Sequence, residues 1–253
     1  MAIVRPDILA VMVSCLVLLF ISAFTLKKVK LRMIPTVEAS IEAVRVATEK
    51  GSPVLFDTGW TGTRFSGNAV NLTTLCFVPA TLELAKAMSE EAGKLDVRLI
   101  TATRNPVYRM MSQDFIQQGY AQSGHPERFN PDDINFFPDN TSLIASVVEM
   151  IHRENIGAAV MIGGHSQSSN VVIYEALATS GAMLVAGEIW PNDNSMAALC
   201  ADYLSFAEEN IAIGAYLGDD PIPKAILAGE DIIKGFLIAV TLLGGLLWGL
   251  GVL

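Results

Sequence analysis

Ionisable and hydroxyl side chains stand directly after several short apolar runs of this 253-residue chain. Carboxylates, an imidazole and a guanidinium gathered at one place can transfer protons or hold an anion. If the apolar runs are parallel strands, these side chains share one edge of a sheet, where open α/β sheets bind their ligands. The candidate residues for such a ligand crevice are Asp57, Thr58, Arg104, Asn105, Gly164, His165, Ser166 and Glu188.

The same residue types also occur at strand ends for a simpler reason, because a chain that turns needs glycine and polar residues. The segment around Ser166, GGHSQSS, resembles the nucleophile elbow of α/β-hydrolases. That fold takes its histidine from a position after the serine, whereas the histidines here are His125, His152 and His165. The triad therefore lacks its base, and we expect no catalytic residue. A tight glycine turn followed by a helix-capping serine is the better interpretation.

Metal and cofactor signatures are missing from the sequence. His125 lies in a loop rich in turn formers and His152 in a helical stretch, and neither has a second histidine or cysteine at a ligand spacing. The glycine-rich segment 58–68 has neither the lysine of a phosphate-binding loop nor the G-x-G-x-x-G pattern. We therefore expect no metal and no cofactor. We interpret this segment, which contains Trp60, as a lid or an interface loop.

Short apolar runs alternate with amphipathic stretches in the middle of the chain. The patterns predict strands at residues 53–56, 97–101, 134–137, 158–162 and 182–186 and an edge strand at 203–207, with helices at 37–51, 81–93, 106–122, 141–154, 167–179 and 195–201. Between residues 68 and 81 we expect a helical stretch that Pro79 interrupts. This alternation implies right-handed βαβ units. The predicted fold class is α/β, a Rossmann-like three-layer sandwich with a mostly parallel sheet, flanked by N- and C-terminal transmembrane helices.

Two apolar runs without a charged side chain, residues 8–26 and 235–253, are each long enough to cross the hydrocarbon core of a bilayer as a helix. Lys27, Lys28, Lys30 and Arg32 follow the first run. By the positive-inside tendency, this basic collar places the α/β domain, residues 33–231, in the cytoplasm and both termini outside. We expect an integral protein of the cell membrane with two spans, and the lipid bilayer as its first partner.

The α/β domain is strongly acidic. Residues 33–231 carry 25 acidic and 11 basic side chains, which gives a formal net charge of −14. Such a surface repels phosphate backbones, so nucleic acid is excluded as a partner.

Three features predict self-association into a cyclic homo-oligomer. Gly245 and Gly249 form a G-x-x-x-G step that lets another helix approach closely. The apolar tail around Tyr216 and the loop around Trp60 add apolar surface that marks an interface. Two alternatives stay open, because the glycines can instead pack on the first span of the same chain, and the tail can close the edge of its own sheet.

The segments IPTVEASIEAVRVATEKGSPVLFDTG, FNPDDINFFPDN and GAYLGDDPIPKAILAGEDIIKG resemble a prokaryotic, largely archaeal family of membrane proteins known only as a domain of unknown function. The resemblance implies the arrangement of span, α/β domain and span, and implies no activity, cofactor or catalytic residue. Where that family tends to be apolar after the fourth strand, this chain has GGHSQSS, which argues further against an essential Ser166.

Two functions follow as hypotheses. The first is a membrane-anchored, non-catalytic scaffold or assembly subunit whose acidic domain packs on its own copies or on another membrane complex. The second is a small-ligand enzyme or sensor that uses the crevice at the carboxyl ends of the strands.

Overall fold

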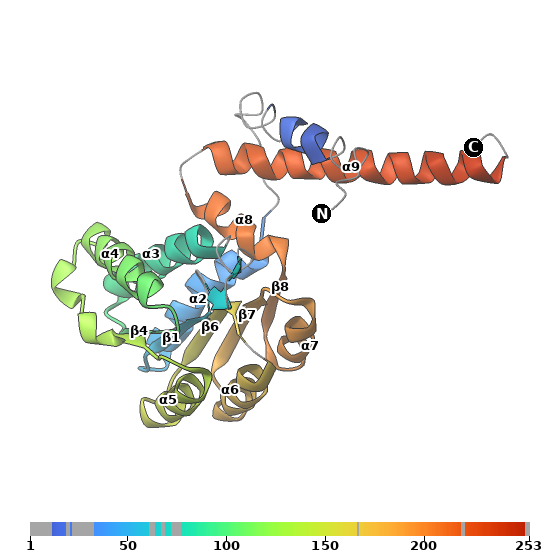
Figure 1. The fold of residues 1–253 in the computed structure, drawn as a ribbon. Coiled ribbons are helices and arrows are strands. Elements are labelled where there is room, and N and C mark those ends of the chain that lie inside the picture. Colours follow the sequence, from blue (N-terminus) through green and yellow to red (C-terminus); the bar gives the residue numbers. More distant parts are fainter. Residues whose placement is uncertain are drawn as a thin grey trace. The chain divides into compact units, whose positions relative to one another are not determined.

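Parallel strands form the central sheet of the protein, in a computed structural model that describes residues 12–18, 21, 33–60, 64–66, 69–71, 77–165, 167–218 and 221–250. The strands of this sheet are β1 (Val54–Gly59), β4 (Leu99–Thr103), β5 (Ile134–Phe136), β6 (Ala158–Gly164), β7 (Met183–Glu188) and β8 (Tyr203–Phe206). They lie in the order β5-β4-β1-β6-β7-β8, and every neighbouring pair is parallel (Figure 1).

Helices cover both faces of this sheet. Figure 1 shows α2 (Pro35–Glu49), α3 (Val78–Leu95), α4 (Pro106–Gln122) and α8 (Glu208–Leu217) on one side, and α5 (Asn140–Arg153), α6 (Gln167–Ser180) and α7 (Pro191–Cys200) on the other. Each interface has its own apolar core, one including Val160 and Ile213 and the other Met161 and Leu177. β1, β4 and β6 are buried along their whole length, which explains why their sequences are mostly apolar. The predicted Rossmann-like three-layer sandwich is confirmed.

Local sequence signals fix where the helices begin. Prolines open α2, α4 and α7, where the missing N–H has no partner to lose. The side chain of Asn105 caps α4 by accepting hydrogen bonds from the backbone N–H groups of Val107 and Tyr108. Asp139 and Ser142 form a reciprocal capping box at the start of α5. The helix expected at residues 195–201 begins earlier, because Pro191 is its first residue.

The connection between β1 and α3 differs from the prediction. We expected a loop over residues 58–68 and then a helical stretch broken at Pro79. Instead, β2 (Arg64–Ser66) and β3 (Ala69–Asn71) form an antiparallel pair, and α3 begins only at Val78. Strands of three residues are too short to show an alternating pattern. Pro79 lies in the first turn of α3, a position that tolerates proline, so it marks a helix start and does not interrupt a helix.

Helix α9 (Pro221–Gly249) belongs to a second compact unit, apart from the α/β unit Met33–Gly218. It begins fourteen residues before the apolar run that the sequence marks at residue 235. Its apolar half is exposed, as at Phe236, Leu242 and Leu246. Within the part of the chain that the structure describes, no helix is both long enough and apolar enough to cross a membrane.

Candidate functional site

The sheet has a topological switch point between β1 and β6. The chain leaves β1 towards α3 on one face and leaves β6 towards α6 on the other face (Figure 1). In open α/β sheets, ligands bind outside the carboxyl ends of the two strands at this point. Asp57 lies in the last half of β1, and His165 follows β6 directly. The candidate site is therefore where fold geometry and ionisable side chains coincide.

His165 lies between two carboxylates from the neighbouring strands. Its Nε2 is 3.3 Å from Oδ1 of Asp57, and its Nδ1 is 3.0 Å from Oε1 of Glu188. All three side chains are fully buried. Burial alone would lower the pKa of His165, but the charges of Glu188 and Asp57 and the contacts with them raise that pKa well above its ordinary value. The ring is therefore an imidazolium held on both sides.

Glu188 is the most connected member of this cluster. The hydroxyl of Tyr174 donates to its Oε1 over 2.6 Å, and the backbone N–H of His165 donates to its Oε2 over 3.3 Å. Burial and the charge of Glu188 raise the pKa of Tyr174 well above its ordinary value, so this tyrosine remains a donor. Two asparagines bind the backbone of Glu188. Oδ1 of Asn194 accepts from the N–H of Glu188, and Nδ2 of Asn194 donates to the carbonyl of Glu188. Nδ2 of Asn210 donates to the same carbonyl.

Gly59 makes room for the imidazole. Its φ of +50° lies in the left-handed region, and a Cβ there would come within 2.4 Å of the Gly164 carbonyl oxygen and 2.7 Å of Cδ2 of His165. The N–H of Gly59 donates to Oδ1 of Asp57, and the N–H of Trp60 donates to the Gly164 carbonyl. A glycine at this position thus lets the ends of β1 and β6 close around the ring.

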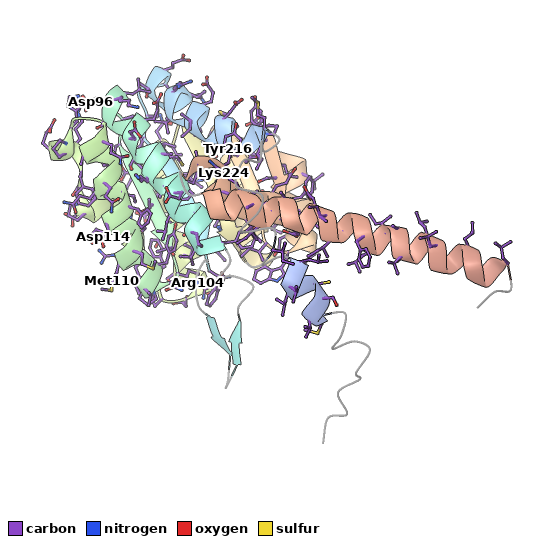
Figure 2. The ribbon with its side chains drawn as sticks, turned by 90° about the horizontal axis from the view of Figure 1, so that it is seen from above. Asp96, Arg104, Met110, Asp114, Tyr216 and Lys224 are labelled. Atoms are coloured by element: carbon purple, nitrogen blue, oxygen red, sulfur yellow. The ribbon has the colours of Figure 1, made fainter. Side chains whose placement is uncertain are left out.

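Arg104 and Trp60 form a second feature at the same end of the sheet. The guanidinium carbon of Arg104 lies 3.3 Å from the centroid of the Trp60 ring, a cation–π arrangement. Nη1 of Arg104 donates to the side-chain oxygen of Asn140, and its backbone N–H donates to the carbonyl of Gly59. Figure 2 shows Arg104 beside the start of α4. The end of β4 is thereby tied to the end of β1.

The structure brings together only part of the predicted crevice. Asp57, His165 and Glu188 are in direct contact, and the ion pairs offset part of the cost of burying their charges. Gly164 packs against Gly59 next to these three residues. Arg104 contacts the cluster only indirectly, by a hydrogen bond from its backbone N–H to the carbonyl of Gly59.

Other predicted residues have local tasks. The hydroxyl of Thr58 donates to the carbonyl of Ala102 within the sheet, and Asn105 caps α4. Ser166 lies outside the described residues.

Several members of the cluster were missed by the sequence analysis. Tyr174 resembles any core aromatic of an amphipathic helix, and Asn194 and Asn210 resemble ordinary helix residues. Asp193 is the most informative omission, because it is only 2% exposed yet ionisable. Burial raises the pKa of Asp193 to about 6, with the charge of Glu188 acting in the same direction and that of His165 opposing it. The sequence feature that could have identified Asp193 is its position shortly after the end of β7.

The predicted interface residues lie in different surroundings. Tyr216 is partly buried and packs against the core of its own domain. Trp60 is also partly buried, beneath Arg104. By contrast, a Cβ added at Gly245 or Gly249 would meet nothing within 4 Å, so both glycines of the G-x-x-x-G step lie open.

The chemistry available to the cluster is limited by its own contacts. Both ring nitrogens of His165 face carboxylates, so the imidazole has no lone pair to accept a proton from a substrate. Among the residues that the structure describes, no group of three or more His, Cys, Asp and Glu side chains could hold a metal ion. The arrangement is thus suited to holding charge and donating or accepting hydrogen bonds.

Comparison with known proteins gives one match. The family model with the description "Domain of unknown function (DUF6754)" matches residues 3–252, nearly the whole chain. The chain belongs to this family. The match confirms that part of the resemblance seen in the sequence. No curated protein matches the chain. No solved structure matches it either.

Proposed function

We propose that the protein is a membrane-anchored sensor whose α/β domain binds a small polar ligand at the carboxyl ends of β1 and β6. The observation that carries this proposal is the buried cluster of Asp57, His165 and Glu188 from three adjacent strands at the switch point. A buried ionic cluster contributes little net stability, because the cost of removing its charges from water offsets their attraction. Its presence at the ligand-binding end of the sheet therefore favours a role in binding.

The contacts that His165 and Tyr174 make within the cluster favour binding over catalysis. A general base needs a free lone pair within reach of its substrate. Each nitrogen of the raised-pKa imidazole of His165 lies within 3.3 Å of a carboxylate, and the hydroxyl of Tyr174 already donates to Glu188.

The membrane anchor is part of the proposal. Residues 235–253 contain no charged side chain, and the exposed residues of α9 after Lys234 include Phe236, Ile238 and Leu243. Apolar side chains in such numbers are costly to leave in water. With residues 8–26 as a second span, the basic collar at residues 27–32 supports a cell-membrane protein with its domain in the cytoplasm and both termini outside.

A second candidate function is the non-catalytic scaffold or assembly subunit. The observation that favours it is the apolar patch at β8 and the end of α7, where Leu199, Tyr203 and Phe206 are exposed. Such a patch suits a protein partner, either another copy or a different membrane complex.

Thermal unfolding with ligand libraries distinguishes the two functions. The purified full chain in lipid nanodiscs would be screened against small polar metabolites. The sensor proposal predicts compounds that raise the melting temperature of the wild type and of the exposed control Asp114→Asn, but not of Asp193→Asn. A library without effect on any variant, together with a stable complex that Tyr203→Asp dissociates, would favour the scaffold.

A further inference from the structure

We infer that the ligand carries a positively charged amine or guanidine group and is not a phosphate or a nucleotide; this inference rests on the proposed binding site. It depends on the charge of the cluster, on two acceptors without donors, and on the state of the N–H groups that an anion would need.

The cluster has more carboxylates than cations. Asp57 and Glu188 lie on either side of the single imidazolium, that of His165. Asp193 is near enough for the charges of Glu188 and His165 to act on it, and all four side chains are at most 2% exposed. The guanidinium of Arg104, at the end of β4, is directed to Trp60 and Asn140. In a buried region, such an excess of negative charge repels anions and attracts cations strongly.

Two carboxylate oxygens have no hydrogen-bond donor. Oδ2 of Asp57 and Oδ1 of Asp193 are buried and accept no hydrogen bond from any residue that the structure describes. Buried acceptors are rarely left unsatisfied, because each costs about 1–3 kcal/mol. An ammonium or guanidinium group supplies several N–H donors together with the compensating charge. The two oxygens therefore mark where a cationic ligand would donate.

Within the described residues, the two usual backbone positions for an anion at this end of the sheet are altered. The pyrophosphate of a dinucleotide normally binds where a glycine-rich turn passes directly from the first strand into a helix. In this protein a β-hairpin follows β1, and α3 begins only at Val78. The other candidate is the turn between β6 and α6, but the N–H of His165 in that turn already donates to Oε2 of Glu188. A carboxylate of the protein thus accepts from an N–H group that a phosphate bound at this turn would need.

Calorimetric titration of the full chain in nanodiscs tests the inference. The probes are agmatine and butylamine as cations, ATP and inorganic phosphate as anions, and Mg²⁺ as a cation without N–H donors. We expect agmatine or butylamine to bind, and Asp193→Asn to weaken this binding about tenfold or more. Binding should also weaken between pH 7.5 and pH 5, because Asp193 is protonated below its pKa of about 6.

The controls separate this inference from non-specific attraction and from failure of the proposed site. Asp114→Asn removes one exposed carboxylate of α4 (Figure 2) and should leave amine binding unchanged. Equal amine affinity in Asp193→Asn and the wild type would overturn the inference, as would binding of only ATP, phosphate or Mg²⁺. A neutral ligand that depends on Asp193 would also overturn it while upholding the proposed function. Absence of any ligand for correctly folded protein would overturn both.

Discussion

Nδ1 of His165 lies 3.0 Å from Oε1 of Glu188, and both side chains are completely shielded from water. Replacing Glu188 by Gln would leave the imidazolium with one counter-charge, and we expect it to lower the free energy of unfolding by about 3 kcal/mol. Glu175→Gln, at an exposed position of α6, is the control and should have little effect. Urea unfolding followed by circular dichroism measures the difference.

The pair of His165 and Glu188 also makes the free energy of unfolding depend on pH, in a direction that the pKa of His165 determines. Because the folded-state pKa of His165 is raised above its ordinary value of 6.5, its pairing stabilises the protein fully below pH 6.5. This contribution is lost as pH rises through the folded-state pKa. The difference between wild type and Glu188→Gln should therefore be largest near pH 6 and shrink in alkaline buffer. A stability difference that grows with pH would show that His165 is not a protonated imidazolium in the folded protein.

Gly59→Ala should be far more damaging than a similar change at another left-handed glycine. Gly59 and Gly51 have φ values of +50° and +63°, but only at Gly59 would a Cβ meet neighbouring atoms. Gly51→Ala should cost about 1 kcal/mol for the backbone conformation alone. We expect Gly59→Ala to cost at least twice as much, because the Gly164 carbonyl and the His165 ring must move. Equal melting temperatures for the two variants would refute the close packing.

Asp193→Asn should stabilise the protein at neutral pH. The pKa of Asp193 is raised from 3.8 to about 6, so the folded state loses stability as pH rises through this window. At pH 7.5 the substitution removes a buried charge, and the gain should be on the order of 2 kcal/mol. At pH 4 the wild-type acid is protonated in most folded molecules, and the gain should nearly vanish. Thermal unfolding at the two pH values checks both parts. With this gain in stability, a loss of ligand binding by the variant would not be due to unfolding.

The proposed topology places residue 122 in the cytoplasm. Gln122→Cys, exposed at the end of α4, should resist a membrane-impermeant maleimide in intact cells, in a background with Cys15, Cys76 and Cys200 replaced. Ala2→Cys, at the proposed outer terminus, should react. Permeabilised cells provide the control in which both positions label. Rapid labelling of Gln122→Cys in intact cells would reverse the topology.

The G-x-x-x-G step predicts an oligomer held through α9. Gly249→Leu would block close approach of a second helix, whereas Gly235→Leu, also in open surroundings, lies outside the step. Native mass spectrometry from nanodiscs should show a cyclic assembly for the wild type and the Gly235 variant, and smaller species for Gly249→Leu. A wild-type monomer would rule out this part of the prediction.

The sequence predicts the layers of the fold well because burial on both faces leaves strong apolar runs, as in β1 and β6. The helix α4 was predicted with its observed bounds, since Pro106 and Asn105 are local signals. The hairpin of β2 and β3 was not predicted, because strands of three residues show no usable periodicity. Strand order was also beyond the sequence, since it depends on contacts between distant segments.

The candidate site was predictable only where strand ends reveal it. Asp57, His165 and Glu188 follow apolar runs, and parallel strands must bring such positions to one edge. Their mutual contact and burial depend on the registers of three strands, which no short motif encodes. Tyr174 and Asp193 reach the cluster from helices, where polar residues are common and carry no distinguishing pattern.

Helix α9 runs without interruption from Pro221 to Gly249, over 29 residues or about 43 Å. Its charged half, with the ion pair between Glu230 and Lys234, and its apolar half share one continuous backbone. Because hydrogen bonds connect each turn to the next along the whole helix, rotation of one half about the helix axis turns the other half with it. Each residue advances about 100° around that axis. A shift of α9 by one residue against whatever packs on it would therefore present a different face of the helix along its whole length.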